Sequence, residues 1–132
     1  MILLTPSQRA RLLANGRLRD ADHVPVVKLF NPFGQGTWLA TELDEDGDIL
    51  FGLADLGYPE LGSWSLSEVA AIRLPFGLGI ERDLHFEGQF PISVWAEAAR
   101  AEGSISAAER VLSTRAQREG RAGCGRRGSG RP

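Results

Sequence analysis

Runs of β-branched and aliphatic residues in the first half of the chain predict strands separated by turns. The runs cover residues 24–30, 37–43, 49–56 and 61–64, and Gly, Pro, Asn and Asp are frequent between them. Asp46-Gly47 is a strong hairpin signal. Pro25 cannot donate a ladder hydrogen bond, so it belongs at the start of its strand or on an edge. The pattern predicts a small antiparallel sheet, a meander of about three strands plus one or two further strands.

Capping residues and helical spacing predict three or four short helices beside this sheet. Thr5 and Gln8 form a capping box, and Ser65 and Glu68 form a second one. After Pro91, apolar residues recur at the spacing of one helix face, and Gly103 can end that helix. These three helices are expected over residues 6–15, from 66 to about 73, and between 91 and 103. The fold class is therefore α+β.

Residues 80–87 alternate between apolar and charged side chains, with one exception at Arg82, which predicts a half-buried strand. Its outer face would carry Glu81, Asp83, His85 and Glu87, with neighbours about 7 Å apart. The row is either a solvated face that discourages edge pairing, or a site in which Asp83 orients His85 as a base or the row shares a metal ion. One strand cannot supply a closed coordination shell, so no metal site and no catalytic residue is assigned.

From residue 106 onward the composition changes, and large apolar residues become rare. Ser106 and Glu109 can start a last short helix that ends near residue 118. The Arg/Gly-rich stretch from Gly120 buries too little surface to offset its ordering entropy, so we expect it to be disordered. The chain is thus expected to form a single domain over residues 1–105 and a C-terminal extension over residues 106–132.

Charge divides the chain at the same place. Residues 1–105 hold 15 Asp and Glu against 8 Lys and Arg, whereas residues 106–132 hold 2 against 7. An acidic body repels phosphate backbones, so any contact with nucleic acid would have to use the extension. No signal-like or membrane-spanning segment is found, and the single cysteine, Cys124, fits a reducing compartment. A cytoplasmic protein without membrane contact is expected.

Five stretches of the body are distinctive. They are PVVKLF (25–30), TWLATEL (37–43), FGLADLG (51–57), PELG (59–62) and IERDLHF (80–86). In these stretches the chain resembles a bacterial family catalogued as a domain of unknown function and found mainly on plasmids and integrative elements of proteobacteria. The resemblance covers residues 1–105 and implies a small accessory protein of mobile DNA. It brings no catalytic residues with it.

Motifs for chemistry are incomplete in this sequence. The acidic turn 44–48 resembles part of a calcium loop, but the bidentate Glu required six residues after Gly47 is replaced by Leu53. Cys124 has no histidine near it in sequence, and no Gly-x-Ser-x-Gly elbow occurs. No cofactor is expected.

Most of the aromatic residues are expected in the core. Phe33 and Tyr58 lie in predicted turns, so they are the candidates for exposed binding anchors. The sequence favours a non-catalytic interaction protein whose acidic, partly aromatic surface binds a host or element-encoded protein, in a sharper version by DNA mimicry in an anti-defence role. Two alternatives stay open. One is a metal-dependent enzyme using Glu81, Asp83 and His85, and the other is a nucleic-acid-binding accessory factor that uses the basic tail.

Overall fold

The centre of the molecule is a five-stranded antiparallel sheet with the order β4-β3-β2-β1-β5. The computed structural model describes residues 2–128, and side chains over residues 2–120. The elements are α1 (Pro6–Gly16), β1 (Val27–Phe30), β2 (Thr37–Leu43), β3 (Ile49–Asp55), β4 (Pro59–Ser65), α2 (Leu66–Ala70), the 3-10 turn η1 (Pro75–Gly77), β5 (Glu81–Arg82), α3 (Ile92–Glu102) and α4 (Ile105–Gly128). The predicted α+β fold on an antiparallel meander is confirmed.

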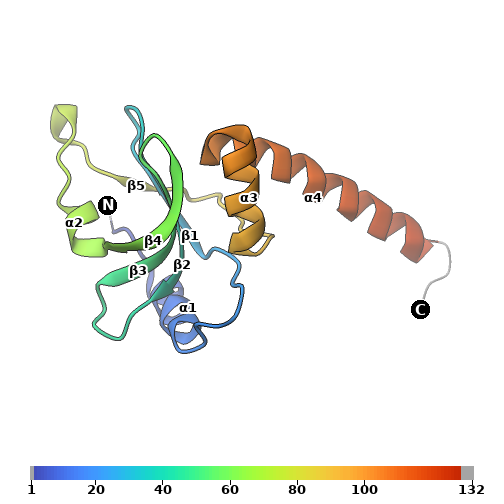
Figure 1. Cartoon of the computed structure of the whole chain (residues 1–132), viewed down its shortest axis with the longest axis horizontal. Coiled ribbons are helices and arrows are strands. Elements are labelled where there is room, and N and C mark those ends of the chain that lie inside the picture. The colour runs from blue at the N-terminus through green and yellow to red at the C-terminus, as the bar shows by residue number, and fades with distance from the viewer. Residues whose placement is uncertain (1, 129–132) are drawn as a thin grey trace.

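Helices pack against both faces of the sheet (Figure 1). On one face α1 and α2 contribute Leu12 and Leu66 to a buried cluster, and on the other face α3 and α4 build a second cluster. Strand β2 supplies both clusters, because Trp38 belongs to the first and its neighbour Leu39 to the second. Consecutive strand residues point to opposite faces, so an apolar run without alternation is what a strand covered on both sides requires.

A β-bulge at Thr41 changes which face the end of β2 presents. The register of β2 against β3 slips before Glu42, which pairs with Phe51. The Thr41 hydroxyl donates to the Phe51 carbonyl at 3.1 Å, and the Thr41 carbonyl accepts from the Asn15 side chain at 3.0 Å. One extra residue reverses the alternation of side chains. Leu43 therefore joins the cluster under α1, and Glu42 turns to the opposite face.

The predicted capping box of α1 is present, and that of α2 is present in half. The cap expected at Ser106 is wrong, because α4 starts at Ile105 and the Ser104 hydroxyl accepts from the Ala107 amide at 3.0 Å. The Thr5 hydroxyl accepts from the Gln8 amide at 3.1 Å, and the Gln8 side chain accepts from the Thr5 amide at 3.0 Å. The Ser65 hydroxyl accepts from the Glu68 amide at 3.2 Å. Gly103 ends α3 with a φ of 92°, a conformation that favours glycine. The starts of α1, α2 and α3 are therefore as predicted, and α2 is shorter than expected.

The strand expected over residues 80–87 is wrong for most of its length, since only the two residues of β5 pair with β1. Asp83 ends the strand, because its carboxylate accepts from the His85 amide at 2.9 Å and so forms a local turn. Leu84, expected on the buried face, is exposed. The alternation in this segment therefore does not mark two faces of a strand.

Helix α4 begins where the body was expected to end and continues to Gly128, past the predicted end near residue 118. Ala, Arg, Gln and Glu make up much of residues 107–119, and they are strong helix formers. The structure is thus helical over residues 120–128, where the sequence predicted disorder, and residues 129–132 lie outside the described residues. Ile105, Ala108 and Leu112 are buried in the cluster with α3, whereas the later turns project away from the sheet (Figure 1).

Candidate functional site

The charged row expected at residues 81–87 is dispersed, and Asp83 belongs to an ion-pair network. Its carboxylate lies 3.5 Å from Nζ of Lys28, and the same ammonium lies 2.6 Å from the carboxylate of Glu109 in α4. The Lys28 side chain is only 13% exposed. A charge so far removed from water needs opposite charges beside it. Asp83 therefore helps to bind β1 to α4 and is not available as a free ligand.

The other members of the row lie in two separate depressions. Glu81 lines one of them with residues around η1, and His85 and Glu87 line the other, of about 330 Å³, together with Glu109. Among the residues with described side chains, no three His, Cys, Asp or Glu lie close enough to hold a metal ion. The structure thus brings together only His85 and Glu87, and a binding role for the row stays a prediction.

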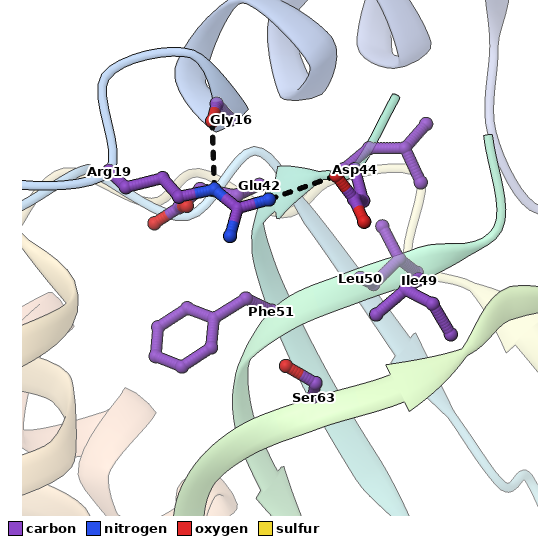
Figure 2. Close-up of a pocket in the computed structure, with 9 residues that line it drawn as sticks. Gly16, Arg19, Glu42, Asp44, Ile49, Leu50, Phe51 and Ser63 are labelled. Atoms are coloured by element: carbon purple, nitrogen blue, oxygen red, sulfur yellow. Dashed lines mark hydrogen bonds and ion pairs between the residues drawn. The ribbon is translucent and has the colours of Figure 1, made fainter. Parts of the chain in front are cut away.

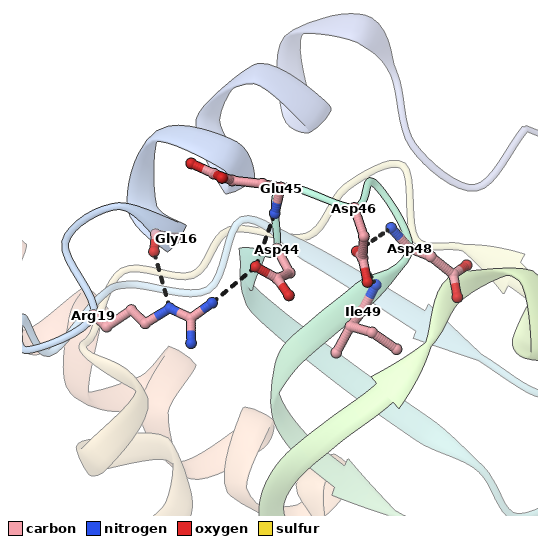
Figure 3. Close-up of polar contacts among 7 residues, drawn as sticks. All are labelled: Gly16, Arg19, Asp44, Glu45, Asp46, Asp48 and Ile49. Carbon is pink, nitrogen blue, oxygen red and sulfur yellow. Dashed lines mark hydrogen bonds and ion pairs between the residues drawn. The ribbon is translucent and has the colours of Figure 1, made fainter.

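The acidic turn between β2 and β3 uses its carboxylates to hold its own backbone (Figure 3). Asp46 accepts from two backbone amides further along the turn, at 2.9 and 3.0 Å. Asp44 accepts from the Glu45 amide at 2.9 Å and pairs with Arg19 at 2.9 Å. These contacts are those of a hydrogen-bonded hairpin turn, in which one oxygen of Asp44 and one of Asp46 are already occupied.

Three further carboxylates accept from the first turns of helices. Asp48 accepts from the Ser65 hydroxyl at 2.7 Å and the Ser67 amide at 2.8 Å, and these hydrogen bonds lower the pKa of Asp48. Asp22 and Asp55 accept from backbone amides at the starts of α3 and α4, at 3.1 and 3.0 Å. Negative charge at a helix N-terminus is stabilising. Part of the acidic surplus of the body therefore serves the fold.

The β1–β2 turn and η1 lie at the opposite end of the sheet from the acidic turn (Figure 1), and each carries an exposed aromatic side chain. Phe33 in the β1–β2 turn and Phe76 in η1 are 49% and 90% exposed, and their ring centroids lie 6.0 Å apart. Phe76 has a φ of 62°, which is rare for a bulky residue and costs about 1–2 kcal/mol. The chain thus presents an apolar ring to solvent from a strained backbone.

The β3–β4 turn extends this aromatic region. It lies against the β1–β2 turn, since a Cβ on Gly57 would be 3.3 Å from the side-chain oxygen of Gln35. The turn exposes Leu56 and Tyr58, and Asp55 holds it by accepting from the Gly57 amide at 3.0 Å. We call these residues the turn-end surface: Phe33, Leu56, Tyr58 and Phe76.

Phe33 and Tyr58 are both exposed in the structure, and their role as anchors stays a prediction. The ring that contacts Phe33 is that of Phe76. Phe76 was not among the predicted anchors, although an aromatic between Pro75 and Gly77 in a segment that breaks a helix was the available signal.

A pocket of about 290 Å³ opens on the sheet face to which the bulge turns Glu42 (Figure 2). Arg19 forms one wall, Phe51 of β3 lines the sheet side, and Ser63 of β4 lies at the edge. The Glu42 carboxylate is half-buried, and no described residue donates a hydrogen bond to it or forms an ion pair with it. Burial raises the pKa of Glu42, against the opposing charges of His23 and Arg19. Glu42 was missed because its place depends on the bulge.

The chain is similar to known proteins at the level of one family. The model of a family described as "Protein of unknown function (DUF2958)" matches residues 3–106. No curated protein and no solved structure matches the chain. Within residues 2–128, no helix combines the length and the apolar character that crossing a membrane requires.

Proposed function

Because the chain belongs to the DUF2958 family of proteins of unknown function, we propose from its geometry that it is a non-catalytic module that binds another protein through the turn-end surface. The partner is a host or element-encoded protein in the cytoplasm of a bacterium that carries a plasmid or an integrative element. This setting is the one implied by the resemblance of the sequence.

The observation that carries the proposal is the exposed ring of Phe76. A fold gains nothing from an aromatic that is 90% exposed and held at positive φ, because little surface is buried and the backbone is strained. Strained residues cluster at functional surfaces. The ring of Phe33 lies beside that of Phe76, and Leu56 and Tyr58 are exposed in the β3–β4 turn, which lies against the turn that carries Phe33. Aromatic residues dominate binding energy at protein interfaces.

An anti-defence role agrees with this proposal when the partner is a component of a host defence system. Contact through aromatic residues supports that role better than DNA mimicry does. A mimic needs free carboxylates on one face, whereas Asp22, Asp48, Asp55 and Asp83 are bound to helix starts or to Lys28.

The two alternatives have less support. The row that a metal-dependent enzyme would use is divided between an ion pair and two depressions. On α4, Arg115 lies over the Phe90 ring, 5.0 Å from its centroid, and pairs with Glu119 at 3.2 Å. Of the arginines in the extension that a nucleic-acid-binding factor would use, Arg110, Arg115 and Arg118 are exposed on α4, and those from residue 121 onward lie outside the described side chains.

Site-specific cross-linking in the native host tests the proposal. A photoreactive phenylalanine analogue replaces Phe76 in one strain and Leu84 in another. Leu84 is a matched control, because it is a 67% exposed apolar residue outside the turn-end surface. We expect a discrete cross-linked protein from position 76 and none from position 84. Identical cross-links from both positions, or none from position 76, would contradict the proposal.

A second variant separates binding from folding. Phe76→Gly removes the ring and relieves the positive φ, so we expect the free energy of unfolding to rise by about 1 kcal/mol while partner binding is lost. The pair of measurements is urea unfolding and pull-down of the cross-linked partner. Retained binding by this folded variant would show that the ring is not an anchor.

A further inference from the structure

The Glu42 pocket lies on a different part of the molecule from the turn-end surface and has its own chemistry. It is bordered by the chain after α1 and by β2, β3 and β4, next to the acidic turn (Figure 2). Three features define what it can hold: an unpaired carboxylate, an excess of one negative charge and an apolar lining.

The carboxylate of Glu42 is available to a ligand. The nearest cation in the wall, Arg19, is committed elsewhere, since its Nε donates to the Gly16 carbonyl at 3.2 Å and its Nη2 pairs with Asp44 at 2.9 Å (Figure 3). Arg19 and Asp44 balance each other, and His23, which with Arg19 opposes the charge of Glu42, forms no ion pair with it, so among the lining residues Glu42 leaves one negative charge without an ion-pair partner. A half-buried carboxylate without hydrogen bonds is unfavourable, and burial raises the pKa of Glu42 accordingly. A positively charged hydrogen-bond donor would supply both the missing hydrogen bond and the missing opposite charge.

The rest of the lining is suited to an apolar body. Ile49, Leu50 and Phe51 of β3 line the pocket, and Ser63 adds one hydroxyl. A volume of about 290 Å³ is at the lower end of the range for ligand pockets and admits a small molecule or one side chain. The Phe51 ring offers a further attraction, because the face of an aromatic ring attracts cations. Anions would meet the carboxylates of Glu42 and Asp44 and are disfavoured.

We propose that this pocket binds an organic cation, an ammonium or guanidinium group on a short apolar body, with the cationic group at Glu42 and the body over Ile49 and Phe51. The same chemistry is offered by a free small amine or guanidine and by a lysine or arginine side chain of another protein. The proposal does not depend on the function of the turn-end surface.

Titration of the full chain with simple probes, followed by amide NMR shifts, tests the proposal. We expect benzylamine and benzamidine to shift amides of Glu42, Phe51 and Ser63. Benzyl alcohol, which has the same ring without the charge, should bind about tenfold more weakly or worse, since a charged hydrogen bond is lost. Equal binding of benzyl alcohol, or shifts confined to other residues, would overturn the proposal.

Two variants and a second set of probes complete the test. Glu42→Gln keeps the shape of the pocket and should lower benzylamine affinity about tenfold. Glu45→Gln removes the same charge from the exposed acidic turn and should leave the affinity unchanged. Tighter binding of N-acetyl-lysine and N-acetyl-arginine amides than of benzylamine indicates a side chain of a partner as the source, and the reverse order indicates a free small cation. Unchanged affinity in Glu42→Gln, or no binding by any cation, refutes the inference. Phe76→Gly should bind these probes like the parent chain.

Discussion

Removal of α4 is expected to destabilise the body severely, although the sequence places the end of the domain at residue 105. The perturbation is a chain that ends at Ser104, compared with a chain that ends at Gly120. The longer chain keeps the turns of α4 that carry Ile105, Ala108 and Leu112, all of which are at most 3% exposed. The shorter chain lacks them and uncovers the face of α3 against which α4 packs, in the cluster that also contains Leu39 and Leu53 of the sheet.

The size of the loss follows from the buried surface. Full burial of an aliphatic side chain is worth about 1.5–3 kcal/mol, so two large side chains and one alanine amount to about 4–7 kcal/mol. Glu109 is removed as well, which leaves Lys28 with Asp83 as its remaining partner. Since native domains are stable by only about 5–15 kcal/mol, the chain ending at Ser104 should lose a large part of its free energy of unfolding.

Urea unfolding followed by tryptophan fluorescence measures the difference, and Trp95 of the affected cluster is a built-in reporter. The single variant Leu112→Ala should lower the free energy of unfolding by about 2–5 kcal/mol. The neighbouring Val111→Ala, at a side chain 46% exposed, should change it by only about 0.5 kcal/mol. If the chain ending at Ser104 unfolds within about 1 kcal/mol of the chain ending at Gly120, the packing argument for α4 fails.

Three more predictions concern the body. Lys28→Met leaves two carboxylates facing each other and should lower the free energy of unfolding by about 1–3 kcal/mol in urea melts, and an unchanged midpoint would mean that the network contributes nothing. Gly52→Ala should prevent folding, because its Cβ would lie 1.8 Å from the Leu39 carbonyl oxygen. Gly62→Ala meets open space and should fold, and circular dichroism of the two variants measures the difference. Asp48→Asn should be less stable than the parent at neutral pH. The folded-state pKa of Asp48 is lowered, so its ionised carboxylate stabilises the folded chain above the ordinary aspartate pKa. This contribution is lost as pH falls through the lowered pKa. Thermal melts of the two chains should therefore converge in acid.

Local signals explain why much of the fold could be predicted from the sequence. Thr5 with Gln8, Ser65 with Glu68, and Gly103 are signals that act within one helical turn, so they need no distant partner. The meander follows in the same way from strand-length apolar runs separated by short turns. Exposure of Phe33 and Tyr58 was predicted because turns lie on the surface.

The contacts of the charged residues could not be predicted from local sequence patterns. The alternation over residues 80–87 predicted a strand, but the Asp83 turn and its ion pair with Lys28 end the strand after β5. Glu109, the stronger partner of Lys28, is 81 residues away in the chain. No local pattern identifies such a partner, because the pairing depends on how the tertiary structure brings α4 beside β1.

By itself the sequence determined the class of fold, the positions of the turns between strands and of the caps of α1 and α2, and the acidic character of the body, all of which depend on neighbouring residues or on composition. Only the tertiary structure decided that α4 belongs to the core, that Phe76 lies beside Phe33, and that Glu42 faces a pocket. The last case shows the physical reason. One extra residue in β2, held by the Asn15 side chain of α1, reverses the faces of the strand. The carboxylate of Glu42 therefore faces the pocket, whereas alternation alone would have put it in the core under α1.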